Sequence, residues 1–243
     1  MIKVAIQHYK QSHGYSQFSP RCVLFDMDGV LYNSMPNHAV AWHEAMKQFG
    51  IHFTADDSYA TEGARGVDTI RKYVLEQQGK EISSEEAQRM YDVKTEIFHH
   101  MPIAEIFPGV IDVMQKIKSA GMTIGVVTGS GQRPLIKRLL NDFDGFLTED
   151  HIVTAYDVER GKPNPDPYLM GLRKTGNNNP WQGIVVENAP LGVRAGSAAN
   201  CFTIGINSGP LPDSALADNG ADIVLQQMTD LCNLWDEILQ NID

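Results

Sequence analysis

Short apolar runs alternate with longer stretches of helical periodicity along most of the chain. The runs, which we interpret as strands, lie at residues 22–26, 122–128, 183–187, 201–206 and 222–225. Near-continuous apolar runs are typical of strands buried on both faces of a parallel sheet. The helical patterns between and after them occupy residues 109–121, 133–143, 165–176, 189–200 and 229–240. This alternation predicts an α/β fold with an open, doubly wound, Rossmann-like parallel sheet.

One segment, residues 36–103, breaks the alternation because it contains helical patterns and no clear strand. Helices are predicted there at residues 37–50, 67–79 and 83–101. We therefore expect an inserted helical domain at 36–103 and a core domain made of residues 21–35 and 104–243. Residues 1–20 have only a very short apolar patch and no cleavage site. They are expected to form a soluble N-terminal extension and not a signal peptide.

Composition narrows the classes of partner for this 243-residue chain. A hydrophobic fraction of 42% is enough for a buried core, but no apolar run is long enough to cross a bilayer. The formal net charge of −10, with no block of lysines or arginines, disfavours nucleic acid as a partner. Cys22, Cys201 and Cys232 have neither metal-site nor disulfide spacing. We therefore expect a cytoplasmic protein, monomeric or weakly homo-oligomeric, with buried thiols.

Polar residues follow the ends of several predicted strands. Asp26 and Asp28 end the first strand, and "TGSG" at 128–131 ends the second. "ENAP" at 187–190 ends another, and Lys162 lies between them in "RGKPNPDPY". Because ligands bind at the carboxyl ends of parallel strands, we expect these groups to meet at one edge of the sheet.

Taken in order, the stretches DMDG, VVTGS, GKPNPDPY and VVENAPLGV resemble the motifs of the haloacid dehalogenase-like (HAD-like) superfamily of phosphatases and phosphomutases. The resemblance runs from about Cys22 to the C-terminus. "GKPNPDPYL" and "APLGVRAG" are most similar to the branch that contains β-phosphoglucomutase and related sugar phosphatases. Each motif alone is weak, but four in this order are specific. The resemblance implies that the insert is a cap over the site.

The resemblance implies that Asp26 is a nucleophile that forms an aspartyl phosphate, and that Asp28 is the general acid and base. It implies Mg²⁺ as cofactor, bound by the Asp26 carboxylate, the Asp28 carbonyl and the acidic end of the later strand, Glu187 with Asn188. Asn188 departs from the family pattern, which has an aspartate there, so one negative charge is lost. We also expect crowding by carboxylates to raise the pKa of Asp28.

The same resemblance implies a phosphate-binding role for Thr128 and the backbone N–H groups of Gly129 and Ser130 at a helix start. Lys162 would neutralise the charge on the transferred group. Taken singly, "TGSG" and "ENAP" are more often turns or helix starts, and a lone lysine is more often a surface residue.

Candidate cap residues are Glu62 and Arg65 in "ATEGARGVDTI", which resembles a substrate-specificity loop. A solvated surface loop is an equal alternative, because loop function depends on geometry. His38 lies where relatives carry a histidine that positions Asp28, although it could simply pack a helix. Ser34 could bind Asp28 or cap the next helix.

We therefore expect an Mg²⁺-dependent phosphohydrolase that acts on a small phosphorylated substrate, either a hexose phosphate or inorganic pyrophosphate. A β-phosphoglucomutase-type mutase is the close alternative, since both share the first half-reaction. A non-catalytic phosphometabolite-binding protein is a remote alternative that Asn188 would support. A dehalogenase is disfavoured, because that chemistry needs no second aspartate such as Asp28.

Overall fold

The structure, a computed structural model, describes residues 1–243. Its centre is a six-stranded sheet in which every pairing is parallel, with the order β3-β2-β1-β4-β5-β6. The strands are β1 (Cys22–Phe25), β2 (Thr123–Val127), β3 (Ile152–Val153), β4 (Gly183–Glu187), β5 (Phe202–Ile206) and β6 (Ile223–Leu225). The predicted doubly wound α/β fold is confirmed. Strand β3 was not predicted, because its two residues are too few to form a hydrophobic pattern.

The pairing register brings the site-forming strand ends to one level. Phe25 of β1 is opposite Val126 of β2 and Val186 of β4. Asp26 is the first residue after β1 and therefore lies beside the ends of both neighbouring strands.

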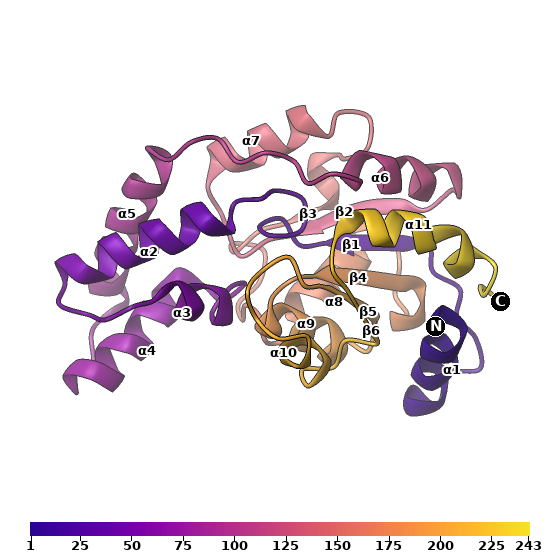
Figure 1. Cartoon of the computed structure of the whole chain (residues 1–243), viewed down its shortest axis with the longest axis horizontal. Coiled ribbons are helices and arrows are strands. Elements are labelled where there is room, and N and C mark those ends of the chain that lie inside the picture. The colour runs from indigo at the N-terminus through magenta and orange to yellow at the C-terminus, as the bar shows by residue number, and fades with distance from the viewer.

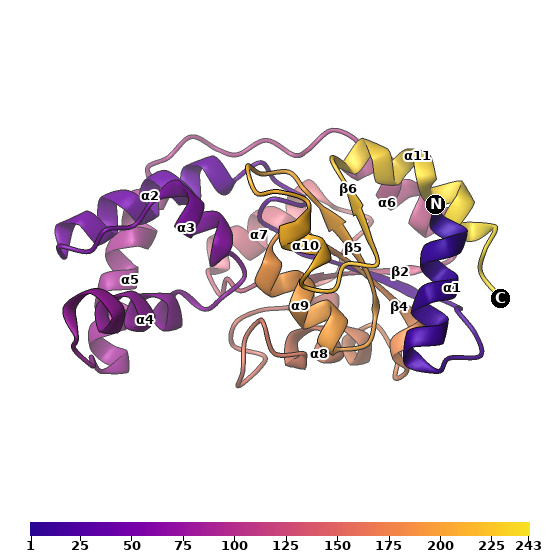
Figure 2. The same ribbon diagram turned by 60° about the horizontal axis from the view of Figure 1, so that its bottom comes forward.

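Helices cover both faces of this sheet (Figures 1 and 2). One face, which carries Val23 and Phe25, forms the larger apolar core with four helices. These are α1 (Ile2–His13), α6 (Val110–Ser119), α7 (Arg133–Asp142) and α11 (Met228–Leu239). The other face, which carries Cys22 and Leu24, packs on α8 (Asp166–Lys174) and α9 (Pro190–Ala198). The short helix α10 (Ser214–Ala217) contacts α9, and 3₁₀ turns lie at Glu149–His151 and Pro180–Gln182.

The N-terminal segment is more ordered than an extension would be. Ile2, Ile6 and Tyr9 of α1 are buried in the larger core, and the Tyr9 hydroxyl donates to the Asn200 carbonyl at 2.8 Å. The spacing of Ile2, Ile6 and Tyr9 is helical, so the sequence contained this signal. Figure 2 shows α1 beside α11, at the end of the molecule away from α2 to α5.

Four helices form the insert: α2 (Met35–Gln48), α3 (Ala55–Ala60), α4 (Gly66–Gln78) and α5 (Ser84–His99). They enclose an apolar cluster of their own that includes Trp42, Met46 and Phe53. The short helix α3 was not expected; the Thr54 side chain caps it, and Asp57 completes the capping box. We call these four helices and their connections the cap.

Two chain crossings join the cap to the core, and they pair with each other. Tyr32 forms an antiparallel bridge with Ile106, and the Phe107 N–H donates to the Leu31 carbonyl at 3.0 Å. This paired hinge places the start of α2 close to the end of β1. None of the helices combines the length and apolar character needed to cross a membrane.

Candidate active site

The loop after β1 is held tightly against the loop after β4. Its Gly29 has a φ of 82°, a conformation that favours glycine. A Cβ at Gly29 would lie 2.0 Å from Nδ2 of Asn188. The absence of a side chain therefore lets the chain reverse after Asp28 directly against Asn188.

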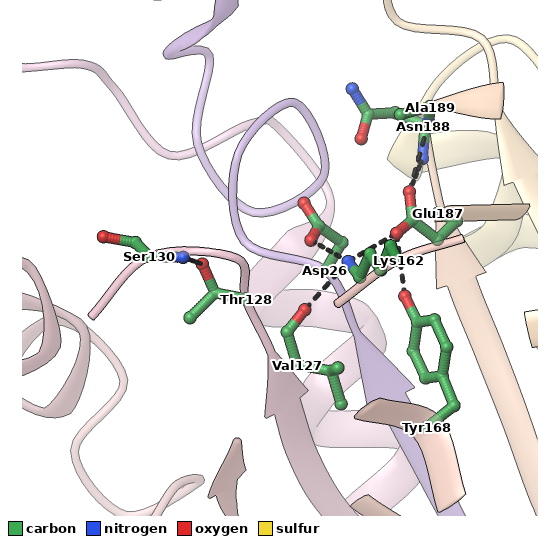
Figure 3. A network of polar contacts seen from close by, with 9 residues as sticks. All are labelled: Asp26, Val127, Thr128, Ser130, Lys162, Tyr168, Glu187, Asn188 and Ala189. Atoms are coloured by element: carbon green, nitrogen blue, oxygen red, sulfur yellow. Dashed lines mark hydrogen bonds and ion pairs between the residues drawn. The ribbon is translucent and has the colours of Figure 1, made fainter. Parts of the chain in front are cut away.

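Lys162 joins the ends of three strands, as Figure 3 shows. Its ammonium donates to Asp26 Oδ1 at 2.5 Å, to the Val127 carbonyl at 3.0 Å and to Glu187 Oε1 at 2.6 Å. Asp26, Lys162 and Glu187 are all buried. The structure thus brings together these three residues, which are far apart in the sequence, at the predicted edge of the sheet.

The charges of this group do not balance. Burial raises the pKa of Asp26 to about 8, with Lys162 opposing the rise and Glu187 and Asp28 adding to it. Burial would by itself lower the pKa of Lys162, but Asp26 and Glu187 raise it above its usual value. One ammonium therefore faces several carboxylates. A further cation would balance the negative charge that remains.

The two oxygens of Glu187 are already occupied. Oε1 accepts from Lys162 and from the Tyr168 hydroxyl, at 2.6 and 2.8 Å. Oε2 accepts from the backbone N–H groups of Asn188 and Ala189, at 2.9 and 3.1 Å. Glu187 is therefore suited to fixing Lys162 and the loop, and less suited to direct metal ligation.

By contrast, Asp26 Oδ2 and Asn188 Oδ1 are buried oxygens with no hydrogen-bond partner. Buried polar atoms normally have partners, so these two oxygens are suited to a ligand cation. No group of three or more His, Cys, Asp or Glu side chains forms a metal cluster. The donor set fits Mg²⁺ only as a carboxylate, the Asn188 amide oxygen and a main-chain carbonyl such as that of Asp28, which suits a hard cation that retains water.

The loop after β2 that was predicted to bind phosphate, residues 128–130, is partly closed by its own contacts, and we call it the phosphate loop. The buried Thr128 accepts a hydrogen bond from the Ser130 N–H at its Oγ1, at 3.0 Å. The helix that follows, α7, begins only at Arg133. Thr128, Gly129 and Ser130 line a cavity of about 40 Å³ between the core and the cap, together with Asp28. The predicted phosphate-binding residues therefore face the same space as the predicted acid and base.

Asp28 contacts cap residues, and its pKa is not raised as the sequence led us to expect. The Ser34 hydroxyl donates to Asp28 Oδ1 at 2.6 Å, and His38 Nε2 lies 3.2 Å from the same oxygen. Burial raises the pKa of Asp28, but His38, Ser34 and Lys94 outweigh burial and lower it below its ordinary value. That expectation was wrong, because hydrogen-bond donors and not carboxylates are the nearest neighbours. Of the two roles considered for Ser34, contact with Asp28 is the one observed, since it makes no side-chain cap bond.

Lys94 of α5 is a site residue that the sequence analysis missed. It is buried, and its Nζ lies 2.7 Å from Nδ1 of His38. Its ammonium also lies 5.2 Å from the ring centre of Trp42 and 5.0 Å from that of Phe98. Burial lowers the pKa of Lys94 to about 8, while Glu62 and Asp28 partly oppose this. Its signal was available: Ala87, Met90 and Lys94 follow the buried stripe of α5, where a lysine is out of place.

The two residues predicted from the specificity loop have different surroundings. Glu62 lines the cavity beside Asp28 and Lys94, and burial together with Asp28 and Asp26 raises its pKa well above its usual value. Arg65 is half-buried and makes other contacts; its Nε donates to Asp68 at 2.8 Å and its Nη1 to the Glu159 carbonyl at 3.0 Å. Arg65 therefore links the cap to the core loop and lies outside the 40 Å³ cavity.

Comparison with known proteins agrees with this geometry. A family model for haloacid dehalogenase-like hydrolases matches residues 23–206. This chain belongs to that family. Hexitol phosphatase A of Escherichia coli (strain K12) is 31% identical over 206 residues, which cover 84% of this chain and 90% of that protein. Beta-phosphoglucomutase of Bacillus subtilis (strain 168) is 25% identical over 217 residues, 87% of this chain and 91% of that protein.

A solved structure from Bacteroides vulgatus, assigned provisionally as a beta-phosphoglucomutase, superimposes with a TM-score of 0.95 at 45% identity. The superposition covers 100% of this chain and 98% of that chain. These matches confirm the predicted fold and the family resemblance. They also show that this haloacid dehalogenase-like protein is an enzyme of the phosphatase and phosphomutase kind.

Proposed function

We propose that the protein is an Mg²⁺-dependent phosphohydrolase that forms an aspartyl phosphate on Asp26. The observation that carries this proposal is the state of Asp26 itself. One of its oxygens is held by Lys162, and the other is buried and has no partner. Asp28, two residues further on, lines the cavity that the phosphate loop also lines. A carboxylate fixed in this way is oriented for attack and does not need to reorganise.

In the first step, an Asp26 carboxylate oxygen attacks phosphorus while the bond to the leaving oxygen breaks. Asp28 gives its proton to that oxygen as it leaves. Asp28 is ionised in the free protein, because its pKa is lowered. A phosphoryl group bound nearby adds negative charge and raises that pKa, so that Asp28 can carry the proton once substrate is present.

In the second step, Asp28 takes a proton from water, and the resulting hydroxide oxygen attacks the phosphorus of the aspartyl phosphate. The bond to Asp26 breaks, inorganic phosphate leaves, and the Asp26 carboxylate is restored. Throughout both steps Lys162 balances the charge on the transferred group. When bound by Asp26, Asn188 and the Asp28 carbonyl, Mg²⁺ supplies positive charge that reduces repulsion between the carboxylate and the phosphoryl oxygens.

We propose that the substrate is a small phosphorylated metabolite, either a hexose phosphate or inorganic pyrophosphate. Similarity to hexitol phosphatase A supports the first. The cap side of the cavity offers one cation, Lys94, and one acid, Glu62, whose raised pKa reduces its repulsion of an anion. Both groups can hydrogen-bond to sugar hydroxyls, and Lys94 can also contact a second phosphate. Arg65 remains a proposed contact only for a leaving group that reaches outside the cavity.

A β-phosphoglucomutase-type mutase is the second candidate, supported by the similarity to the Bacillus subtilis enzyme and the Bacteroides vulgatus structure. The two reactions differ only in the acceptor. In the mutase, a sugar hydroxyl takes the phosphoryl group from Asp26 in place of water.

Phosphate release should be measured over sugar phosphates, nucleotides and pyrophosphate, with and without Mg²⁺, beside a coupled mutase assay. The hydrolase proposal predicts Mg²⁺-dependent release from at least one sugar phosphate or pyrophosphate. Turnover in the coupled assay alone, stimulated by hexose bisphosphate, would replace it with the mutase. If the protein neither binds Mg²⁺ in calorimetry nor turns over any substrate, both candidates are wrong.

A further inference from the structure

Tyr168, on the first turn of α8, contacts the charged group behind the site without reaching the cavity. It is fully buried in the smaller apolar core, where its neighbours include Leu24 and Val185. Its hydroxyl donates to Glu187 Oε1 at 2.8 Å. Figure 3 shows this hydroxyl below Glu187, on the far side of Lys162 from the phosphate loop. Tyr168 is not among the residues that line the cavity.

The oxygen that Tyr168 contacts is the one that holds Lys162. Glu187 Oε1 accepts from both the ammonium and the phenol, at 2.6 and 2.8 Å. The Tyr168 ring centre also lies 5.2 Å from the Lys162 nitrogen, within range of a cation–π contact. Tyr168 therefore touches both partners of one buried ion pair.

Glu187 has little freedom apart from this contact. Its other oxygen accepts two backbone N–H groups, and a Cβ at Gly192 would lie 1.8 Å from Oε1. The Tyr168 hydroxyl is thus the side-chain donor that shares Oε1 with Lys162. If it were removed, the full charge of Oε1 would act on the Lys162 ammonium and draw it from Asp26 towards Glu187.

We propose that Tyr168 is a positioning residue for phosphoryl transfer: it shares the charge of Glu187 so that the Lys162 ammonium stays on Asp26. This inference rests on the proposed function for its kinetic consequence, but not for its structural one. The chain offers a matched control in Tyr9, another fully buried tyrosine whose hydroxyl donates a 2.8 Å hydrogen bond, to the Asn200 carbonyl at the other end of the molecule.

The first test is the crystal structure of Tyr168→Phe beside that of the wild type. We expect the ammonium of Lys162 to move beyond hydrogen-bond distance of Asp26 Oδ1 in the variant, while the ring of residue 168 stays in place. An unchanged contact between Lys162 and Asp26 would overturn the inference. This result does not depend on turnover. It therefore tests the positioning of Lys162 by Tyr168 even if the proposed function is wrong.

The second test is kinetic and uses the best substrate from the phosphate-release assay. Because a hydrogen bond to a charged group is lost, Tyr168→Phe should lower kcat about tenfold to a hundredfold, with KM changed less than about threefold. Tyr9→Phe should lower thermal stability about as much as Tyr168→Phe does, but it should leave kcat unchanged. If Tyr168→Phe keeps kcat within about twofold of an active wild type, the inference is wrong.

A double-mutant cycle separates positioning through Glu187 from a general loss of packing. If Tyr168 acts through Glu187, Tyr168→Phe should slow the Glu187→Gln enzyme by no more than about twofold. Multiplicative losses would show that Tyr168 acts independently of Glu187 and would contradict the inference. Circular dichroism of each variant gives the folded fraction by which the rates are corrected.

Discussion

The core and the cap both present charged groups to the same cavity, but these groups are held in place in different ways. On the core side, Asp26, Lys162 and Glu187 form a closed set of short contacts at the ends of neighbouring strands. On the cap side, His38 and Lys94 come from different helices and Glu62 from a loop, and Lys94 is held mainly by aromatic rings and one histidine. The core group is fixed by the sheet, whereas the cap group depends on how helices pack.

This difference suggests a division of work. The rigid core group suits the chemical step, which needs fixed charges. The cap group, joined to the core through a paired hinge, suits the choice of leaving group and acceptor. The Asp28 contacts with Ser34 and His38 connect the two sides of the cavity directly. Substitutions on the core side should therefore affect every substrate alike, and those on the cap side should affect substrates unequally.

The largest expected effect is that of Asp26→Asn. The variant keeps the shape of the side chain but removes the nucleophile, so we expect turnover of every substrate to fall at least about 1,000-fold. Cooperative thermal unfolding should be retained, because Lys162 keeps its contacts with Glu187 and Val127. Steady-state phosphate release and circular dichroism check this. Equal losses on all substrates would support the division, and retained turnover would break it.

A smaller effect is expected for Lys94→Met, which removes the buried cation of the cap. Loss of its contact with His38, which contacts Asp28, should lower kcat/KM about tenfold to a hundredfold, unequally among substrates. Lys72→Met is the control, since Lys72 is an exposed lysine on α4. A uniform loss over the whole panel would place Lys94 with the core group instead.

Lys94 also predicts a pH dependence of stability. Its pKa falls from 10.5 to about 8 on folding, so the unfolded chain binds more protons than the native protein between these values. The free energy of unfolding of the wild type should therefore rise with pH across this window, by about 3 kcal/mol relative to Lys94→Met. Urea denaturation at pH 8 and above checks the sign. If the free energy of unfolding of the wild type instead fell with pH relative to the variant, burial would not disfavour the charged form of Lys94.

Asn188 allows the charge on the core side of the cavity to be varied. Asn188→Asp adds a negative charge next to Asp26 and should tighten Mg²⁺ binding about tenfold, whereas Asn188→Ala removes an oxygen ligand and should weaken it by a similar factor. Isothermal titration with MgCl₂ measures both. If neither variant changes the affinity, the unpartnered oxygen of Asn188 is not a ligand.

The smallest effect is expected for Glu62→Ala. Ratios of kcat/KM between substrates should shift about three- to fivefold, while the free energy of unfolding changes by less than about 0.5 kcal/mol. Unchanged kinetics on every active substrate would show that Glu62 is a solvated loop residue with no part in substrate choice. Asp68→Ala, outside the cavity, is a suitable control from the same part of the cap.

The sequence predicted the core side of the site well for a physical reason. Asp26, Thr128 and Glu187 directly follow or end apolar strands, and the parallel register places such residues together. The order of the strands in the sheet, with β1 at the centre, could not be predicted from the pattern of hydrophobic residues. Strand β3 was missed because two residues give no periodicity.

The cap side was less predictable, because its contacts depend on packing between helices. Lys94 and His38 are 56 residues apart and meet only through the packing of α2 on α5. The same limit explains the wrong expectation for Asp28, whose pKa depends on His38 and Ser34 and not on charge counting. Tyr168 was part of a motif, but only the fold shows that its hydroxyl reaches Glu187.

The most direct test of covalent catalysis by Asp26 is to locate the phosphoryl group on the enzyme. A substrate that the phosphate-release assay identifies should be mixed with the protein and Mg²⁺, quenched in acid during turnover, and the peptides analysed by mass spectrometry. We expect one added PO₃ group on the peptide that contains Asp26, and none in Asp26→Asn. A phosphoryl group on another residue, or turnover without any covalent phosphate, would contradict covalent catalysis by Asp26.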